Sequence, residues 1–177
     1  SKYVGLLTPV SKAFLTDRGL DSTIMAQQVF GGHGYIRETG IEQFVRDTRI
    51  AQIYEGTNGI QAIDFLGRKV TGYNVATLTK FVAEINEELA SLEHVSSSDK
   101  QAINSRFDQL LTIANHINDN KLSQPALINS SAVDFLDAFG YTLYGYYSLL
   151  MAERAHGHED QEFAKQKQFV AQFFMDK

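Results

Sequence analysis

The chain has 177 residues, of which 44% are hydrophobic and 21% are charged, and its net charge is −5. This balance is too apolar for an intrinsically disordered protein, and the length allows one ordinary domain with a substantial core. Lysines and arginines are scattered along the chain, so the sequence does not indicate a nucleic-acid partner. There is no cysteine, and no apolar run reaches the ~18 residues of a membrane span. We therefore expect no metal site and a cytoplasmic location, or peripheral attachment to a membrane.

The composition favours an all-α fold. Only Pro9 and Pro125 interrupt long stretches rich in helix-forming residues. Thr8 followed by Pro9 predicts a helix start, because Thr can cap exposed N–H groups and Pro lacks only a donor that has no partner there. We expect this helix to stop at Gly31 and Gly32. Its apolar residues follow a helical spacing: Val10, Phe14, Leu20, Ile24 and Val29.

Two further helices are expected on either side of a short connection that contains Glu55. One helical pattern covers residues 41–51, and the next begins near Thr57. The connection Tyr54-Glu55-Gly56 places Glu55 at a helix terminus, where its backbone N–H is free to meet a ligand.

Apolar residues from 73 to 177 recur in steps of three and four, which predicts antiparallel helices in a bundle. Ser98 and Gln101 form a capping-box pattern, Pro125 opens a longer helix, and residues 156–158 end it. We accordingly divide the chain into residues 1–72 and a helical extension, residues 73–177. The four predicted core stripes are Val75, Leu78, Val82, Ile85, Leu89 and Leu92; Ile103, Phe107, Leu110, Ala114 and Ile117; Ala132, Leu136, Phe139, Leu143, Tyr146 and Leu150; and Phe163, Phe169, Val170, Phe173 and Phe174.

The segment from Gln27 to Lys69 carries the most specific pattern. It contains Q-x-x-G-G-x-G-Y from Gln28, an R-D pair at Arg46, and I-Y-E-G-T-N-G-I-Q around Glu55. In this order and spacing, the elements resemble the C-terminal region of the acyl-CoA dehydrogenases. The extension resembles that of the larger bacterial members, a group that includes 3-methylmercaptopropionyl-CoA dehydrogenase. The resemblance implies an up-and-down helical bundle with additional C-terminal helices, cut from a longer enzyme that also has an N-terminal helical domain and a middle β-domain.

The resemblance also implies the roles of individual residues. Glu55 corresponds to the base that removes the α-proton of an acyl-CoA thioester while the β-hydride passes to FAD, and desolvation would help this carboxylate. Glu55 and Gly56 would contact the substrate, because the amide of the base hydrogen-bonds the thioester carbonyl in the family. The residues that would contact FAD form two groups: Gln28, Gly31 and Gly32, which correspond to a segment reaching FAD of a neighbouring subunit, and Thr57, Asn58 and Gly59, which correspond to a segment touching FAD within the same subunit.

Several other residues are expected to be structural. Arg46 and Asp47 are predicted to form an ion pair and cap before Glu55. Tyr35 and Tyr54 are predicted to pack with their hydroxyls reaching a partner. The histidines at 156 and 158 fit a loop better than a metal site. The aromatic residues of the long helix are predicted to be core: Phe135, Phe139, Tyr141, Tyr144, Tyr146 and Tyr147.

Family resemblance further implies an acyl-CoA substrate, an electron-transferring flavoprotein as electron acceptor and a homo-oligomer, dimer or tetramer. Because the domains that hold most of the flavin are missing, the chain alone is expected to be inactive. Three alternatives remain. A branched-chain member with its base on another helix is disfavoured, because Glu55 stands at the usual position. An acyl-CoA oxidase would be expected to have E-G-D-N where this chain has Glu55 to Asn58, and a non-catalytic helical interaction module would fit residues 73–177 taken alone.

Overall fold

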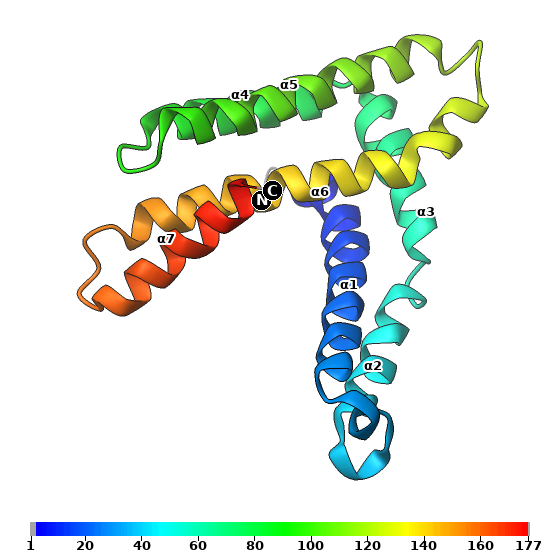
Figure 1. The fold of residues 1–177 in the computed structure, drawn as a ribbon. Coiled ribbons are helices and arrows are strands. Elements are labelled where there is room, and N and C mark those ends of the chain that lie inside the picture. The colour runs from blue at the N-terminus through cyan, green and yellow to red at the C-terminus, as the bar shows by residue number, and fades with distance from the viewer. Residues whose placement is uncertain (1–2, 177) are drawn as a thin grey trace.

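The computed structural model describes residues 3–176, and this part of the chain consists of helices and turns without a strand (Figure 1). The predicted all-α fold is therefore confirmed. The α-helices are α1 (Val4–Val29), α2 (Ile41–Arg49), α3 (Asn58–Ile63), α4 (Ala76–Ser91), α5 (Ser97–Asn120), α6 (Ala126–Ala155) and α7 (Gln161–Met175). Short 3-10 segments are η1 (Gly31–Tyr35), η2 (Arg37–Thr39), η3 (Ile50–Gln52) and η5 (Thr71–Tyr73), and a π-helix, η4 (Asp64–Val70), continues α3.

The first helix starts earlier than the sequence predicts. Helix α1 begins at Val4, and Pro9 lies inside it. The Thr8 hydroxyl donates to the Val4 carbonyl (2.6 Å), so it bonds back along the helix and does not cap a new one. Pro9 lies in the second turn, where it removes the N–H that would otherwise bond to the Gly5 carbonyl. The predicted end is correct, since α1 stops at Val29 and Gly31 follows with a φ of 59°.

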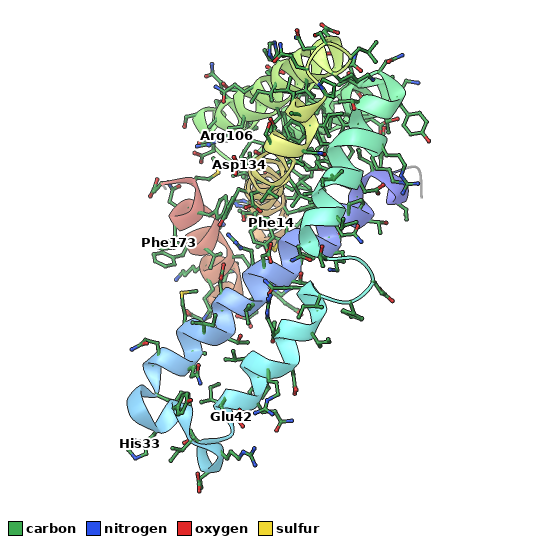
Figure 2. All side chains as sticks on the ribbon, turned by 90° about the vertical axis from the view of Figure 1, so that its right-hand side faces the viewer. Phe14, His33, Glu42, Arg106, Asp134 and Phe173 are labelled. Carbon is green, nitrogen blue, oxygen red and sulfur yellow. The ribbon has the colours of Figure 1, made fainter. Side chains whose placement is uncertain are left out.

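Helices α1 and α2 form a hairpin that extends away from the other helices (Figures 1 and 2). Only the first half of α1 is buried, and its last buried residue is Phe14. Farther along, Ile24 and Val29 of the predicted stripe are 47% and 86% exposed, because no other part of the described chain covers this end of the hairpin.

The stripes predicted for α4, α5 and α6 are confirmed, since every residue named in those three stripes is buried. Their rings and aliphatic chains meet in one core with residues of α1 and η4. Phe139 on α6 lies near its centre, with ring centroids 5.0 Å from Phe65 of η4, 6.0 Å from Phe107 of α5 and 6.1 Å from Phe81 of α4. The extension and the first part of the chain thus share a core.

Helix α5 is capped by a different serine from the one predicted. Ser96 is the N-cap residue, and its side chain accepts a hydrogen bond from the Asp99 amide (3.1 Å). Ser98 is already inside the first turn. The three consecutive serines at 96–98 are all acceptable cap residues, so sequence alone does not choose between them.

Helix α7 is present as predicted, but four of the five residues predicted to form its core stripe are exposed. Phe163, Phe169, Val170 and Phe173 are 41–71% exposed, and the residues that α7 buries are Ala164 and Ala171. Small residues allow α7 to lie close along α6, and the larger apolar residues then point elsewhere. Part of the aromatic run on α6 is also outside the core, since Tyr141, Tyr144 and Tyr147 are 37–46% exposed. No helix among residues 3–176 is long and apolar enough to cross a membrane.

A glycine fixes how α1 crosses α6. A Cβ atom added at Gly140 would lie 2.4 Å from the ring of Phe14. That ring also makes edge contacts with Tyr141 and Tyr144, at centroid distances of 4.9 and 5.0 Å. The absence of a side chain at Gly140 therefore lets α1 approach the bundle, and the base of the α1–α2 hairpin is held there.

Candidate active site

Glu55 lies in the loop between η3 and α3, in an uncommon backbone conformation. Its φ is 53°, and that of Gly56 is 87°, so two consecutive residues are in the left-handed region. Glycine adopts this conformation freely, whereas a residue with a Cβ atom is strained there and needs support from its surroundings. Glu55 is exposed. Any desolvation of its carboxylate must therefore come from groups outside residues 3–176.

The Lys12 side chain of α1 holds this loop through hydrogen bonds. Its ammonium group donates to the Gly56 carbonyl (2.6 Å), to the Gln52 carbonyl (3.2 Å) and to Asn58 Oδ1 (2.7 Å). One side chain therefore connects the start, the middle and the end of residues 52–58. On the opposite side, Gln61 Nε2 donates to the Glu55 carbonyl (2.9 Å).

Asn58 joins α3 to α1. Its Nδ2 group donates to Asp17 Oδ1 (2.6 Å), to Thr16 Oγ1 (3.0 Å) and to the Ala13 carbonyl (3.2 Å). With Lys12 on its Oδ1, both polar atoms of the side chain already have partners. Any contact of Asn58 with a ligand would be made by its backbone.

The other groups around Glu55 remain unoccupied by described residues. No hydrogen bond is formed within residues 3–176 by the Glu55 amide or by its carboxylate. Thr57 caps α3 by its position and makes no side-chain hydrogen bond to it, and a Cβ atom at Gly59 would meet nothing within 4 Å. Tyr54 is 52% exposed, so the prediction that it packs is wrong. The loop thus presents a carboxylate, a free amide and a hydroxyl on an open surface.

The segment that follows α1 and contains Gly31, Gly32 and Gly34, here called the glycine loop, lies at the far end of the hairpin, where His33 is labelled in Figure 2. Gln27 Nε2 holds it by donating to the Gly34 carbonyl (3.0 Å). A Cβ atom at Gly34 would lie 2.3 Å from the Gln27 carbonyl oxygen, so only glycine fits there. Gln28, Gly31 and Gly32 are exposed, and a Cβ atom at either of these two glycines would meet no neighbour. Tyr35 is also exposed (82%), so its predicted packing is wrong.

The two groups of predicted site residues are therefore not brought together. Lys12, beneath the Glu55 loop, and Gln28 are 16 residues apart on α1, which at about 1.5 Å per residue corresponds to about 24 Å. A groove of about 820 Å³ runs between α1 and α2 in the intervening part of the hairpin. Its lining combines apolar and basic side chains: Leu20, Ile24, Ile50, Ile53, Arg37, Arg46 and Arg49 among them.

The predicted ion pair of Arg46 with Asp47 is not formed. Adjacent residues on a helix point in different directions, and Arg46 instead pairs with Glu42, one turn earlier, at 3.1 Å. Asp47 accepts a hydrogen bond from Gln43 at 3.4 Å. Both contacts hold α2 together internally.

His156, which follows the end of α6, is part of a contact between two loops, whereas the ring of His158 lies against Phe163 of α7. The ring of His156 stacks on that of His94, with centroids 3.6 Å apart. The Glu153 carboxylate accepts hydrogen bonds from the amides of Glu93 and His94, and these bonds lower its pKa although partial desolvation acts in the opposite direction. Among residues 3–176 there is no group of three or more side chains suited to hold a metal ion.

Comparison with known families matches nearly the whole chain, in two parts. Residues 75–177 match the family model described as "Acetyl-CoA dehydrogenase C-terminal like". Residues 2–70 match "Acyl-CoA dehydrogenase, C-terminal domain". The chain belongs to the acyl-CoA dehydrogenase family.

Curated members of this family are similar to the chain over different lengths. A 3-methylmercaptopropionyl-CoA dehydrogenase of Ruegeria pomeroyi is 47% identical over 79 residues, which is 45% of this chain and 13% of that protein. A butyryl-CoA dehydrogenase of Syntrophomonas wolfei is 32% identical over 179 aligned positions, 94% of this chain and 29% of that protein. A probable acyl-CoA dehydrogenase of Mycobacterium tuberculosis is 45% identical over 60 residues, 34% of this chain and 15% of that protein. The chain thus spans less than a third of the length of these acyl-CoA dehydrogenases.

Membership of the acyl-CoA dehydrogenase family implies, in general, a flavin cofactor. The exposed groups of this chain can be compared with what such a cofactor would need. The Gln28 amide and the backbone at Gly31 and Gly32 are open to a ligand, and so are the Thr57 hydroxyl and the backbone at Gly59. Uncharged donors and small residues of this kind fit a polar, phosphate-containing cofactor. The Asn58 side chain is the exception, because α1 already occupies it.

Sequence reasoning missed the residues that hold the two loops. Gln61 ends the I-Y-E-G-T-N-G-I-Q pattern and Gln27 begins the segment that contains it, but the patterns assign no role to either residue. Lys12 lies outside both patterns. Lys12 lies 44 residues from the carbonyl it binds most closely. Such a contact is set by the packing of α1 against α3, so no local signal in the sequence could have identified it.

Proposed function

We propose that this chain is the C-terminal part of an FAD-dependent acyl-CoA dehydrogenase that oxidises an acyl-CoA thioester to the trans-2-enoyl-CoA, with Glu55 as the catalytic base. The observation that supports it most is the Glu55 loop. It presents an unpaired carboxylate beside an unpaired backbone amide, and it is held in a conformation that Glu adopts only with support.

Each of these groups has a distinct task in the proposed reaction. The Glu55 carboxylate takes the proton from the α-carbon of the thioester. The Glu55 amide donates a hydrogen bond to the thioester carbonyl, which gains negative charge as the proton leaves. FAD, when bound, supplies the acceptor for the hydride of the β-carbon, so that loss of H⁺ and H⁻ leaves a carbon–carbon double bond.

Residues of two separate loops would hold the cofactor. Thr57, Gly59 and the Asn58 backbone lie next to the base and would contact FAD in the same subunit. Gln28, Gly31 and Gly32 lie too far from Glu55 to contact the same part of one ligand. They would contact FAD bound by a neighbouring subunit. This division supports a homo-oligomeric parent enzyme. By family resemblance, an electron-transferring flavoprotein would then reoxidise the flavin.

The substitution Glu55→Gln in the full-length parent enzyme tests the proposal. The amide keeps the size of the side chain but cannot accept the proton, so flavin reduction by an acyl-CoA should slow by ~10² to 10⁴, while acyl-CoA binding is retained. Stopped-flow bleaching of the oxidised flavin measures both quantities. Glu159→Gln is the matched control, since this residue is exposed in the loop before α7, far along the chain from the site. Unchanged reduction in the Glu55 variant would reject the assignment of the base.

A further inference from the structure

The conformation of the Glu55 loop depends on very few contacts. Within residues 3–176, the carbonyls of Gln52, Glu55 and Gly56 are bound by two side chains, Lys12 and Gln61. The loop residues themselves are mostly exposed, so packing adds little to hold them. Glu55, which has a Cβ atom and is strained at a φ of 53°, would relax to an ordinary backbone conformation if these carbonyls were released.

Lys12 is placed on a rigid part of the molecule. It is half-buried, in the part of α1 that enters the core beside Ala13 and Phe14, both 1% exposed. Its ammonium group binds three oxygen acceptors, which is the full donor capacity of a lysine. Three side chains therefore connect the loop to α1: Lys12, Asn58, and Gln52, whose Nε2 group donates to Asp17 Oδ1. Lys12 is the one among them that binds the loop's backbone carbonyls.

We infer that Lys12 is a positioning residue for the catalytic base: it binds the Gly56 and Gln52 carbonyls and so fixes the backbone from which the Glu55 carboxylate and amide reach the substrate, with Gln61 as a second anchor on the Glu55 carbonyl. The inference rests on the proposed role of Glu55. Lys12 does not touch the substrate, and its effect is exerted through the loop.

A positioning role has a specific kinetic consequence. Proton removal requires the base within a fraction of an ångström of its productive place, and a misplacement of about 1 Å can slow a reaction by roughly 10²-fold. The contact proposed between this loop and the substrate is a hydrogen bond to the thioester carbonyl, so the loop would contribute only part of the binding of an acyl-CoA. Loss of Lys12 should therefore lower the rate of flavin reduction much more than it weakens acyl-CoA binding.

The test uses the full-length, FAD-loaded parent enzyme with Lys12→Met, which keeps the apolar stem and removes the donors. We expect flavin reduction about 10- to 100-fold slower in stopped-flow experiments, with a Kd for acyl-CoA within about threefold of the parent value. Lys12→Arg, which restores a cationic donor, should recover part of the rate. Lys80→Met, an exposed lysine of α4, is the control and should behave as the parent.

Amide hydrogen exchange provides the second measurement. In Lys12→Met, the amides of residues 52–58 should exchange faster, while those of α6 remain protected as in the parent. If Lys12→Met does not fold, Gln61→Met decides the question, because it removes the other anchor of the same loop and should also slow flavin reduction without weakening acyl-CoA binding.

The outcomes separate this inference from the proposed function. Slow reduction in Glu55→Gln together with parental reduction in Lys12→Met would overturn the positioning role alone. Equal losses of rate and of acyl-CoA affinity in Lys12→Met, without recovery in Lys12→Arg, would also overturn it, because general damage to the fold would explain them. Parental reduction in Glu55→Gln would instead reject the function on which the inference rests.

Discussion

Gly32 and Gly34 are two residues apart in the glycine loop but face different surroundings. A Cβ atom at Gly34 would collide with the backbone oxygen of Gln27, whereas one at Gly32 would extend into open space. Gly34 is thus required by the loop itself. The freedom at Gly32 is not needed by the described chain, which agrees with a proposed role in the approach of a cofactor to the backbone.

Replacing each glycine by alanine separates these roles. Gly34→Ala should lower the free energy of unfolding by about 1–3 kcal/mol, since the loop must shift to admit the methyl group. Gly32→Ala should change it by less than about 0.5 kcal/mol. Urea unfolding of the chain followed by circular dichroism measures both. Equal stability of the two variants would contradict the requirement for glycine at residue 34, because the loop would then admit a methyl group there without cost.

At the scale of elements, the sequence predicts the buried residues best where large apolar side chains recur at a helical period. The stripes of α4, α5 and α6 follow a helical period, and all of their residues are buried. The stripe predicted for α7 is wrong because α7 packs through Ala164 and Ala171, whereas most of its large apolar residues are exposed. The Glu55 motif could be found from local spacing, but the Lys12 contact depends on how α1 lies against α3.

Alanine substitutions test this assignment of buried and exposed faces. Ile85 on α4 and Leu143 on α6 are 3% and 7% exposed, so replacing either should cost ~2 to 5 kcal/mol of stability through lost burial and a cavity. Phe169 on α7 is 71% exposed, and Phe169→Ala should cost less than about 0.5 kcal/mol. Chemical denaturation gives these differences. A large cost at Phe169 would mean that this face of α7 is covered in solution.

At the scale of the whole molecule, residues 3–176 offer two open surfaces and do not enclose Glu55. The glycine loop and the Glu55 loop lie toward different ends of the α1–α2 hairpin, and both are exposed. The shared core of α1, η4 and α4–α6 holds the hairpin at its base and leaves its sides uncovered. We therefore propose that other domains of the parent enzyme, and a neighbouring subunit, complete the site and exclude water from it.

This arrangement predicts that the isolated 177-residue chain binds FAD weakly. Each loop contributes only a few uncharged groups on one side of the cofactor, and ordering a flexible dinucleotide against so small a surface offsets most of the gain. Titration calorimetry of the chain should therefore give no saturable heat at micromolar FAD, whereas the full-length parent should retain its flavin through purification. A folded chain is the necessary control, and its circular dichroism spectrum should be helical without a β contribution. Stoichiometric, tight binding by the chain alone would mean that one copy encloses the cofactor, and the division of the site between subunits would then have to be abandoned.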